Sequence, residues 1–408
     1  MESVAQRPRN DRRVIGLLCS GHFLSHFYFL ALPPMFPLLK AEFGVSYVEL
    51  GLAITAYNLL GGFAQAPVGF LVDRFGPRAM LLAGLGLNAL AIMLIGFAGA
   101  YWILLVLAVF AGLGNSVFHP ADYAIMSGSI REDRMGRAFS VHTFSGFFGG
   151  ACAPVAMLTL ASLTDWRTAF IAIGLIGLVV WALMALWGGV LIGENPAAPA
   201  QGGDRTGGPS GMALLMTPPV LMFLGFFIAY GMASGGLSAF TVIGLIELQG
   251  LSLDLANMAL TGHLFGVVGG VALGGFIVDR FRRHGVTAAI ALLVAMGFVL
   301  LPALLGLPVL ALVAIMTIVG LGMGAVLPPR DLMIRAMTPA GQSGKVFGFV
   351  FVGYAVGASL TPLFFGWLLD QGSPALVFFL SAVFLVAALA AITVARRLAA
   401  RLPNYMER

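Results

Sequence analysis

Histidine and aspartate side chains recur in this sequence at the spacing of one helix face. His22 and His26 are separated by one helical turn, and Asn115, His119 and Asp122 follow one another at i, i+4 and i+7. An imidazole exchanges a proton near neutral pH and, when neutral, ligates transition metals. These two groups are therefore candidates for binding a proton, an anion or a metal ion.

A metal site is the narrowest of these interpretations. His22 and His26 have metal-ligand spacing, and Cys19 lies one turn away as a possible third ligand. A transition-metal carrier, or an intramembrane metalloenzyme that uses His22, His26 and His119, is therefore an alternative hypothesis. The chain has no GxSxG or HExxH signature. Our leading interpretation includes no catalytic residue, no metal ion and no cofactor.

The composition is that of an integral membrane protein. Of the 408 residues, 60% are hydrophobic and 10% are charged, whereas a soluble domain has about 25% charged residues. A helix needs roughly 20 apolar residues to cross a bilayer, so the chain has room for about twelve spans. We expect an all-α fold with transmembrane helices at residues 14–39, 46–72, 79–98, 102–129, 136–162, 167–190, 219–245, 254–278, 285–304, 308–336, 342–368 and 373–396.

Two stretches of the chain are nearly identical in sequence. Residues 69–75 read GFLVDRF and residues 275–281 read GFIVDRF, and the later match of residues 136–139 with 344–347 has almost the same offset. Matches at a nearly constant offset indicate an internal duplication, which is typical of transporters. We expect two pseudo-symmetric six-helix bundles, residues 1–192 and 212–408, joined by a cytoplasmic linker at 193–211.

The basic residues predict the orientation in the membrane. If the N-terminus is cytoplasmic, nineteen of the 22 Lys and Arg residues lie on the cytoplasmic side. Both termini are therefore expected in the cytoplasm. The membrane we expect for this chain is the inner membrane of a bacterium. The same asymmetry accounts for the net charge of +5, so we expect the lipid bilayer and a small molecule as partners, no nucleic acid, and a monomeric chain.

The first copy of the repeat resembles a loop motif of the major facilitator superfamily, Gly-x-Leu-x-Asp-Arg-x-Gly-Arg-Lys. Here it reads GFLVDRFGPR at residues 69–78, with Pro77 in place of the first of the final basic pair. The third, sixth, ninth and twelfth predicted helices are poor in polar residues, as in that family. The resemblance implies that Asp73 holds the start of the eleventh helix when the cytoplasmic side closes; the alternative is that Asp73 only ends its helix. The latch residues expected from the motif and its second copy are Gly69, Asp73, Arg74, Gly76, Arg78, Asp279 and Arg280.

The fourth predicted helix narrows the resemblance. Residues 114–120 read GNSVFHP, which is similar to the Ser-Val-Phe-His-Pro run of the fosmidomycin-resistance exporters. This implies efflux of a small anionic molecule, by proton-coupled antiport, with antibiotic resistance. Uptake of a carboxylate-type metabolite by symport is the alternative. The chain has no GxxxxGK[ST] loop, so we expect an ion gradient rather than ATP to supply the energy.

Duplication also relates a charged residue in each half. Asp122 corresponds to Arg330 at an offset of 208, and an ion pair between them could form in one conformation and break in another. The alternatives are a permanent structural pair, or a local pair of Asp122 with Arg131. We expect Pro120 to kink the helix next to His119. The candidate residues for substrate or proton binding are His22, His26, Asn58, Asn115, His119, Asp122, His142, Tyr230, Arg330, Asp331 and Tyr354.

Overall fold

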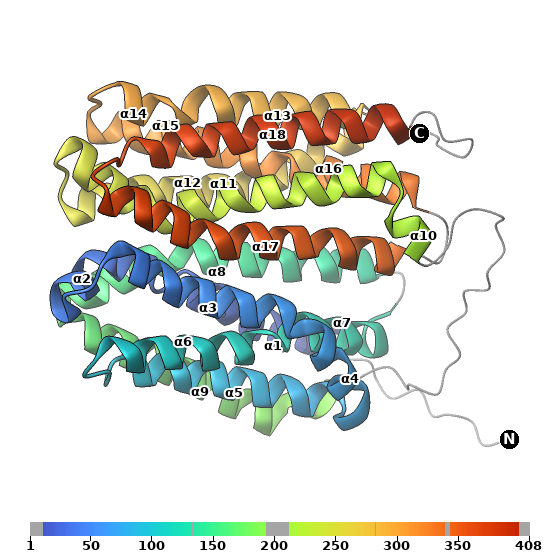
Figure 1. Ribbon diagram of the computed structural model, residues 1–408. Helices are drawn as coiled ribbons and strands as arrows, with labels where there is room; N and C mark the ends of the chain where they lie inside the picture. The colour runs from blue at the N-terminus through green and yellow to red at the C-terminus, as the bar shows by residue number, and fades with distance from the viewer. Residues whose placement is uncertain (1–10, 132–133, 193–211, 282, 339–342, 400–408) are drawn as a thin grey trace, which may run out of the picture. The chain divides into compact units, whose positions relative to one another are not determined.

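The structure is a computed structural model that describes residues 11–131, 134–192, 212–281, 283–338 and 343–399 (Figure 1). Every regular element in these ranges is a helix, which confirms the predicted all-α class. Eleven helical segments of the described chain are long and apolar enough to cross a membrane. The remaining predicted span, the second along the chain at residues 46–72, consists of two shorter helices, α3 (Tyr47–Phe63) and α4 (Gln65–Phe75).

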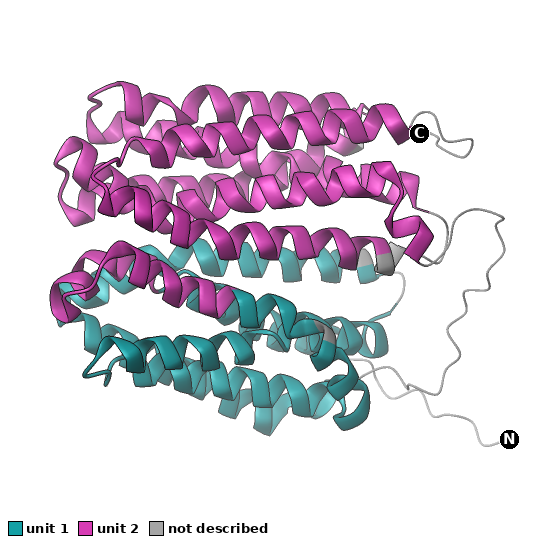
Figure 2. Cartoon of the chain, in the orientation of Figure 1, with its two compact units in different colours: residues 1–31, 59–200 teal, residues 32–58, 201–408 magenta. Residues whose placement is uncertain are grey.

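Contacts divide the chain into two compact units, coloured separately in Figure 2. Unit 1 contains residues 1–31 and 59–200. In it α1 packs on α8, and α5 packs on both α6 and α9. Its helices, besides the end of α3 and α4, are α1 (Asp11–Phe29), α5 (Pro77–Ile95), α6 (Tyr101–Asn115), α7 (Phe118–Ser129), α8 (Met135–Leu163), α9 (Trp166–Trp187) and η3 (Gly188–Val190).

Unit 2 contains residues 32–58 and 201–408. In it α12 packs on α15, and α11 packs on α17 and α18. Besides the start of α3, its helices are η1 (Pro33–Met35), α2 (Phe36–Phe43), α10 (Met212–Leu215), α11 (Pro218–Gln249), α12 (Leu253–Arg280), α13 (His284–Val299), α14 (Leu301–Leu304), α15 (Val309–Ala325), α16 (Leu327–Met337), α17 (Ser343–Asp370) and α18 (Leu376–Ala399).

The predicted linker, residues 193–211, lies outside the described residues, and the division at that linker stays a prediction. The contacts between helices reveal one arrangement that the sequence did not suggest. Residues 32–58, which include η1, α2 and most of α3, pack with the second unit rather than with the first.

Proline positions explain where the long helices are broken. A proline has no N–H to donate to the carbonyl four residues earlier, so a helix that contains one can be interrupted near that carbonyl. The expected kink before Pro120 is present, because α6 ends at Asn115 and α7 begins at Phe118. The same relation holds for the break between α3 and α4 before Pro67, and for the break between α15 and α16 before Pro328 and Pro329.

Within unit 2, α3 lies directly against α17 because glycine occupies both sides of the contact. A Cβ atom at Gly51 would overlap the carbonyl oxygen of Pro362, and one at Gly366 would lie 2.6 Å from the carbonyl oxygen of Tyr47. Neither distance is compatible with a side chain, so these glycines set the spacing of the two helices.

Side chains of α3 use this proximity to bond the backbone of α17. Asn58 Nδ2 donates to the carbonyl of Ala358 at 3.0 Å, and Thr55 Oγ1 donates to the carbonyl of Ser359 at 2.6 Å. Pro362 lies four residues after Ala358 and cannot donate to it, so the Asn58 amide satisfies a carbonyl that the helix itself leaves unpaired.

The first turn of α3 is held by a carboxylate from the end of α17. Asp370 accepts hydrogen bonds from the backbone N–H groups of Tyr47 and Val48, both at 3.0 Å. The first N–H groups of a helix have no partner inside the helix, so Asp370 acts as a cap supplied from a distant part of the chain. Lys40 Nζ lies 3.7 Å from the same carboxylate.

Candidate functional site

Four histidines from α1, α7 and α8 form a cluster in unit 1, which we call the histidine cluster: His22, His26, His119 and His142. The ring of His22 stacks on that of His142 with centroids 3.7 Å apart, and its centroid lies 4.7 Å from His26 and 5.5 Å from His119. His22 and His26 share one face of α1, as their spacing predicted, and the packing of α1 on α7 places His119 beside them.

Small residues of α8 make room for the cluster. A Cβ atom at Gly146 would lie 2.6 Å from His22 Cε1 and 2.9 Å from His26 Cδ2. A Cβ atom at Gly149 would overlap the carbonyl of Phe23. Larger side chains at these positions would push α1 away from α8, so the two glycines keep the imidazoles in contact with each other.

Asp122 is joined to the cluster through His142. His142 Nε2 lies 2.8 Å from Asp122 Oδ2, and the side chains of the two residues are 2% and 0% exposed. The carbonyl of His142 lies 2.9 Å from His22 Nδ1. Since a carbonyl only accepts, His22 carries its proton on Nδ1 and its Nε2 has a free lone pair. That Nε2 is buried and has no hydrogen-bond partner among the described residues, and the same is true of His119 Nδ1.

The two asparagines predicted for the site have different surroundings. Asn115 ends α6 in unit 1, and its Oδ1 atom is buried with no hydrogen-bond partner in the described ranges. Asn58 belongs to unit 2, where its amide bonds the carbonyl of Ala358. In this structure Asn58 therefore connects two helices.

In unit 2, Arg330 lies among aromatic rings. Its guanidinium carbon is 4.4 Å from the ring centroid of Phe227, and 5.7 and 5.9 Å from those of Phe351 and Phe226. The residue is 5% exposed. Its Nε and Nη2 atoms both bond Asp331 Oδ1, at 2.9 and 2.8 Å. The aromatic faces and the carboxylate together stabilise a cation that would otherwise be costly to bury.

Two predicted tyrosines belong to the same aromatic group. The ring of Tyr230 stacks on Phe226 at 5.7 Å and lies 6.3 Å from the ring of Tyr354. Its hydroxyl donates to the carbonyl of Met323 at 3.0 Å. The phenylalanines around Arg330 were not among the residues predicted for the site. Their signal was visible, because Phe226 and Tyr230 stand four residues apart on one helix.

Asp122 and Arg330 both have partners within their own units. Asp122 bonds His142, and Arg330 bonds Asp331. The local partner of Asp122 is thus a histidine, where the sequence analysis named Arg131. The ion pair between Asp122 and Arg330 stays a prediction.

The predicted latch residues of unit 1 lie at the turn from α4 to α5. Gly76 ends α4 with φ of 84°, a conformation that favours glycine. Asp73 and Arg74 are exposed. Arg78 Nη2 donates to the carbonyl of Ala185 at 2.8 Å and so anchors α5 to α9. A Cβ atom at Gly69 would meet no other described residue within 4 Å.

In the second copy of the motif, Asp279 and Arg280 form the last turn of α12, and Arg280 is exposed. The latch role of both copies stays a prediction.

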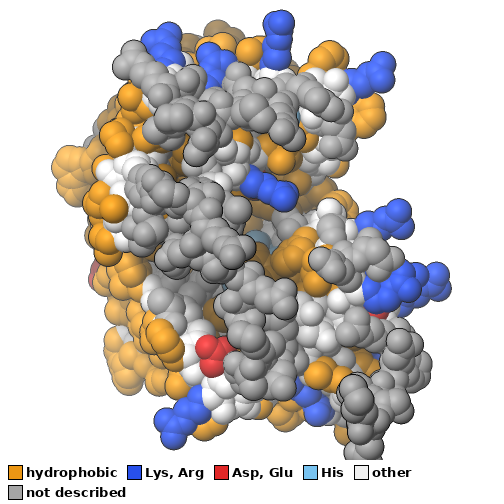
Figure 3. Space-filling view, turned by 90° about the vertical axis from the view of Figure 1, so that its right-hand side faces the viewer, with side chains coloured by type: hydrophobic (Ala, Val, Ile, Leu, Met, Phe, Trp, Pro, Cys, Tyr) orange, Lys and Arg blue, Asp and Glu red, His pale blue; other side chains and the backbone are white. Residues whose placement is uncertain are grey.

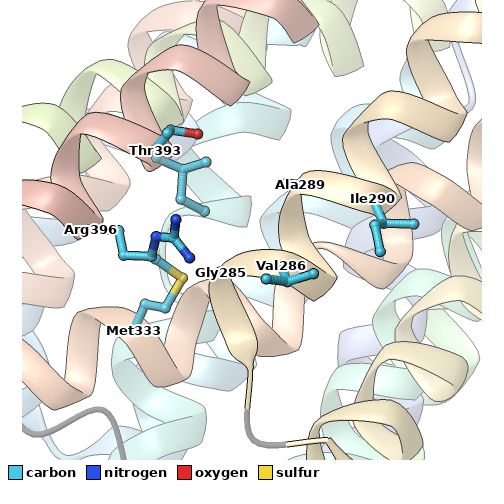
Figure 4. A pocket seen from close by; sticks show the side chains of 8 residues that line it. Gly285, Val286, Ala289, Ile290, Met333, Thr393 and Arg396 are labelled. Carbon is cyan, nitrogen blue, oxygen red and sulfur yellow. The ribbon is translucent and has the colours of Figure 1, made fainter.

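A groove of about 190 Å³ on unit 2 contains none of these candidates (Figure 4). It lies between α13 and α18, with Met333 of α16 at its base and the side chain of Arg396 beside Gly285. Among the described residues that line it, the half-buried Arg396 is the only charged one, so the groove does not resemble the polar centres of the two units.

Known proteins similar to this chain are named as transporters or resistance proteins. The fosmidomycin resistance protein of Escherichia coli (strain K12) is 26% identical over 298 residues, which is 72% of this chain and 72% of that protein. The probable sulfoacetate transporter SauU of Cupriavidus necator is 28% identical over 414 residues, with 95% of this chain and 94% of that protein covered. The multidrug resistance protein MdtH of Salmonella typhi is 23% identical, with 83% of each chain covered.

Solved structures share the fold. A bacterial homologue of the human lysosomal transporter Spinster, in an inward-facing and unoccupied conformation, matches with a TM-score of 0.76 and 15% identity. The match covers 97% of this chain and 98% of that one. A family profile described as Major Facilitator Superfamily matches residues 18–304 and residues 222–404. The whole-chain fold, the sequence relatives and these two matches agree: the chain belongs to the Major Facilitator Superfamily of membrane transporters.

Proposed function

We propose that this chain is a secondary active transporter that moves a small organic anion across the bacterial inner membrane and uses a proton gradient. Export is the favoured direction, as an antiporter that confers resistance to an anionic antibiotic. Uptake of a carboxylate- or sulfonate-type metabolite is the second candidate, because the relatives of the chain include both kinds of protein by name.

The observation that carries the proposal is Arg330. A permanent cation inside a transmembrane helix bundle is costly, and such residues usually serve a substrate or ion pathway. Arg330 is 5% exposed and lies on α16, directly after the proline-broken end of α15. Its guanidinium presents a fork of N–H donors that matches carboxylate, sulfonate or phosphonate oxygens. Asp331 already occupies part of this fork, so an anionic substrate would compete with that carboxylate.

The names of the relatives support an anionic substrate. One relative is named for resistance to fosmidomycin, which is a phosphonate, and another for sulfoacetate, which carries a sulfonate and a carboxylate. Each compound offers a planar or tetrahedral group of oxygens to an arginine. These two compounds are therefore the first substrates to test.

The distribution of basic residues supports an orientation with both termini in the cytoplasm. Nineteen of the 22 Lys and Arg residues lie on the cytoplasmic side in this orientation, and such a bias favours it. Lys and Arg side chains of the described residues are prominent on the surface seen in Figure 3. The proton gradient is proposed because the sequence has no phosphate-binding loop for ATP.

Arg330→Gln and Arg330→Lys test the proposal in proteoliposomes supplied with labelled sulfoacetate or fosmidomycin under an imposed pH gradient. We expect Arg330→Gln to lower transport by about tenfold or more, because a hydrogen bond to a charged group contributes about 1.5–3 kcal/mol. Arg330→Lys should recover only part of the rate, because an ammonium lacks the guanidinium fork. Asp331 is 44% exposed, so water can solvate it when its partner is removed and the variants should fold.

Arg335→Gln is the matched control, because Arg335 lies on the same helix and is exposed. It should transport at the wild-type rate. Wild-type rates in both Arg330 variants would contradict the proposed anion-binding role.

Collapse of the proton gradient with a protonophore should stop accumulation of the substrate, and accumulation that continues would contradict proton coupling. Right-side-out and inside-out vesicles compared at the same gradient distinguish export from uptake.

A further inference from the structure

Three imidazoles of the histidine cluster point ligand atoms at one small volume. One ring nitrogen from each of His22, His26 and His119 lies within 4.8 Å of the others. Two come from one face of α1, and the third comes from the first turn of α7, directly after the break at the end of α6. Cys19, which the sequence analysis considered as a third ligand, is not part of this group; His119 takes that place.

A hydrogen bond fixes His22 in the tautomer that a metal ion needs. His22 donates from Nδ1 to the carbonyl of His142, which leaves the Nε2 lone pair available. His22 is 3% exposed, and within the part of the chain that the structure describes its Nε2 atom has no hydrogen-bond partner. A buried ring nitrogen without a partner loses its hydration without compensation, and a shared cation would remove that cost.

A second layer of contacts holds the His22 ring in place. His142 stacks on it with an interplanar angle of 11°. His142 is itself fixed by Asp122, whose Oδ2 lies 2.8 Å from His142 Nε2. Metal-binding histidines are commonly held in this way, with the second ring nitrogen bonded to a carbonyl and a carboxylate further out.

We propose that His22, His26 and His119 bind a first-row transition metal ion, with Zn²⁺ as the ion to test first. Neutral imidazole suits Zn²⁺ and its neighbours, and three histidines leave one position open for water or another ligand. Zn–N bonds of about 2.0–2.1 Å place tetrahedral ligand atoms about 3.4 Å apart, so small rotations of the rings suffice to close the site. The inference is independent of the proposed anion transport, because Arg330 has no part in it.

Zinc titration of the full chain in detergent tests the site. The protein carries a purification tag without histidines, is stripped with a chelator, and is then titrated calorimetrically and measured for bound zinc after desalting. We expect one Zn²⁺ per chain. His22→Ala, His26→Ala and His119→Ala should each weaken binding by about tenfold or more, since each removes one of three ligands. Co²⁺ in place of Zn²⁺ should give the visible absorption of a four-coordinate nitrogen site in the wild type and lose it in the three variants.

His263→Ala is the matched control. His263 is also a buried histidine with an unpartnered Nδ1, but it lies on α12 of unit 2. Its removal should leave zinc affinity unchanged. Size-exclusion profiles identify any variant that fails to fold, and His→Gln versions replace such variants. No zinc bound by the wild type, or equal affinity in the three variants, would overturn the site.

Anion transport by zinc-stripped and zinc-loaded protein is measured alongside the titration. If the protein binds no zinc but transports the anion normally and in an Arg330-dependent way, the proposed metal site alone is contradicted. If the protein binds zinc but transports no anion, the proposed transport function alone is contradicted.

Discussion

The pairing of Asp122 with His142 decides how unit 1 tolerates a carboxylate in its interior. Both side chains are almost completely buried and bonded at 2.8 Å. A buried polar group without its partner keeps the full cost of desolvation, whereas removal of both partners removes most of that cost. The stability of the unit therefore depends more on the pair being complete than on either residue alone.

We predict that His142→Ala lowers the stability of the metal-free protein by about 2–4 kcal/mol, because Asp122 is left buried without its donor. Asp122→Ala should also destabilise the protein. The double variant should lose less than the sum of the two single losses, by about 0.5–3 kcal/mol. Thermal unfolding in detergent measures all four proteins.

Asp254→Ala serves as the control for loss of a carboxylate, because Asp254 is exposed in the first turn of α12. Its effect should be within about 0.5 kcal/mol. Strictly additive losses for His142→Ala and Asp122→Ala would show that the two side chains do not stabilise each other.

At the residue scale, the sequence predicted which side chains share a helix face but not which helices meet. The spacing of His22 with His26, and of His119 with Asp122, was visible in the sequence. The pairing of Asp122 with His142 was not, because it joins α7 to α8 and depends on how those helices pack. The partnership of Arg330 with Asp331 was overlooked although the two residues are adjacent.

At the element scale, prolines and glycines account for the shapes and contacts of the helices. Pro120 and Pro328 stand at duplicated positions, and each follows a break in a long helix. Pro362 leaves the carbonyl of Ala358 free, and Asn58 from α3 bonds it. The kink at Pro120 could be predicted from the sequence. Pro67 was also visible in the sequence, but residues 46–72 were predicted as one continuous span, whereas the structure divides them into α3 and α4.

We predict that Gly51→Ala pushes α3 away from α17 and destabilises the protein by about 1–3 kcal/mol, because a Cβ atom there overlaps the carbonyl of Pro362. The hydrogen bonds of Thr55 and Asn58 to α17 should lengthen or break. Hydrogen exchange of the detergent-solubilised protein should then show faster exchange in residues 47–58. Thermal unfolding measures the loss of stability.

Gly297→Ala on α13 is the control, because an added Cβ atom there meets nothing within 4 Å and the position is exposed. It should leave stability unchanged or raise it by up to about 1 kcal/mol, since alanine favours a helix more than glycine does. Equal stability of Gly51→Ala and Gly297→Ala would contradict close packing between α3 and α17.

At the scale of the whole molecule, composition and repeats were sufficient to predict the fold class and the family. Twelve apolar stretches and a duplicated Asp-Arg motif led to the major facilitator fold, and the structural and family matches confirm it. The grouping of residues 32–58 with unit 2 could not be predicted in this way. It depends on contacts between residues about 300 positions apart, for which local sequence patterns carry no signal.

We predict that the start of α15, near Val309, and the end of α16, near Met337, face opposite sides of the membrane, with Met337 on the cytoplasmic side. Single cysteines at Gly306 and Ala336, in a background with Cys19→Ser and Cys152→Ser, report this in intact cells. Both positions are exposed and belong to described residues. An impermeant maleimide should label Gly306→Cys from outside, and Ala336→Cys only after the membrane is opened. Labelling of Ala336→Cys in intact cells, with Gly306→Cys protected, would reverse the proposed orientation.

The contact of α3 with α17 has a consequence for how the protein is made. Thr55 bonds a carbonyl 304 positions later, and Asn58 bonds one 300 positions later. A ribosome adds about 5–20 residues per second. The intervening 300 residues therefore take roughly 15–60 s to synthesise, and during that time residues 32–58 have no partner on α17. Unit 2 therefore combines an early segment of this sequence, residues 32–58, with a much later one. A truncated chain that stops before α17 would leave the carboxylate-capped start of α3 unmatched, and membrane quality-control proteases could recognise such an incomplete product.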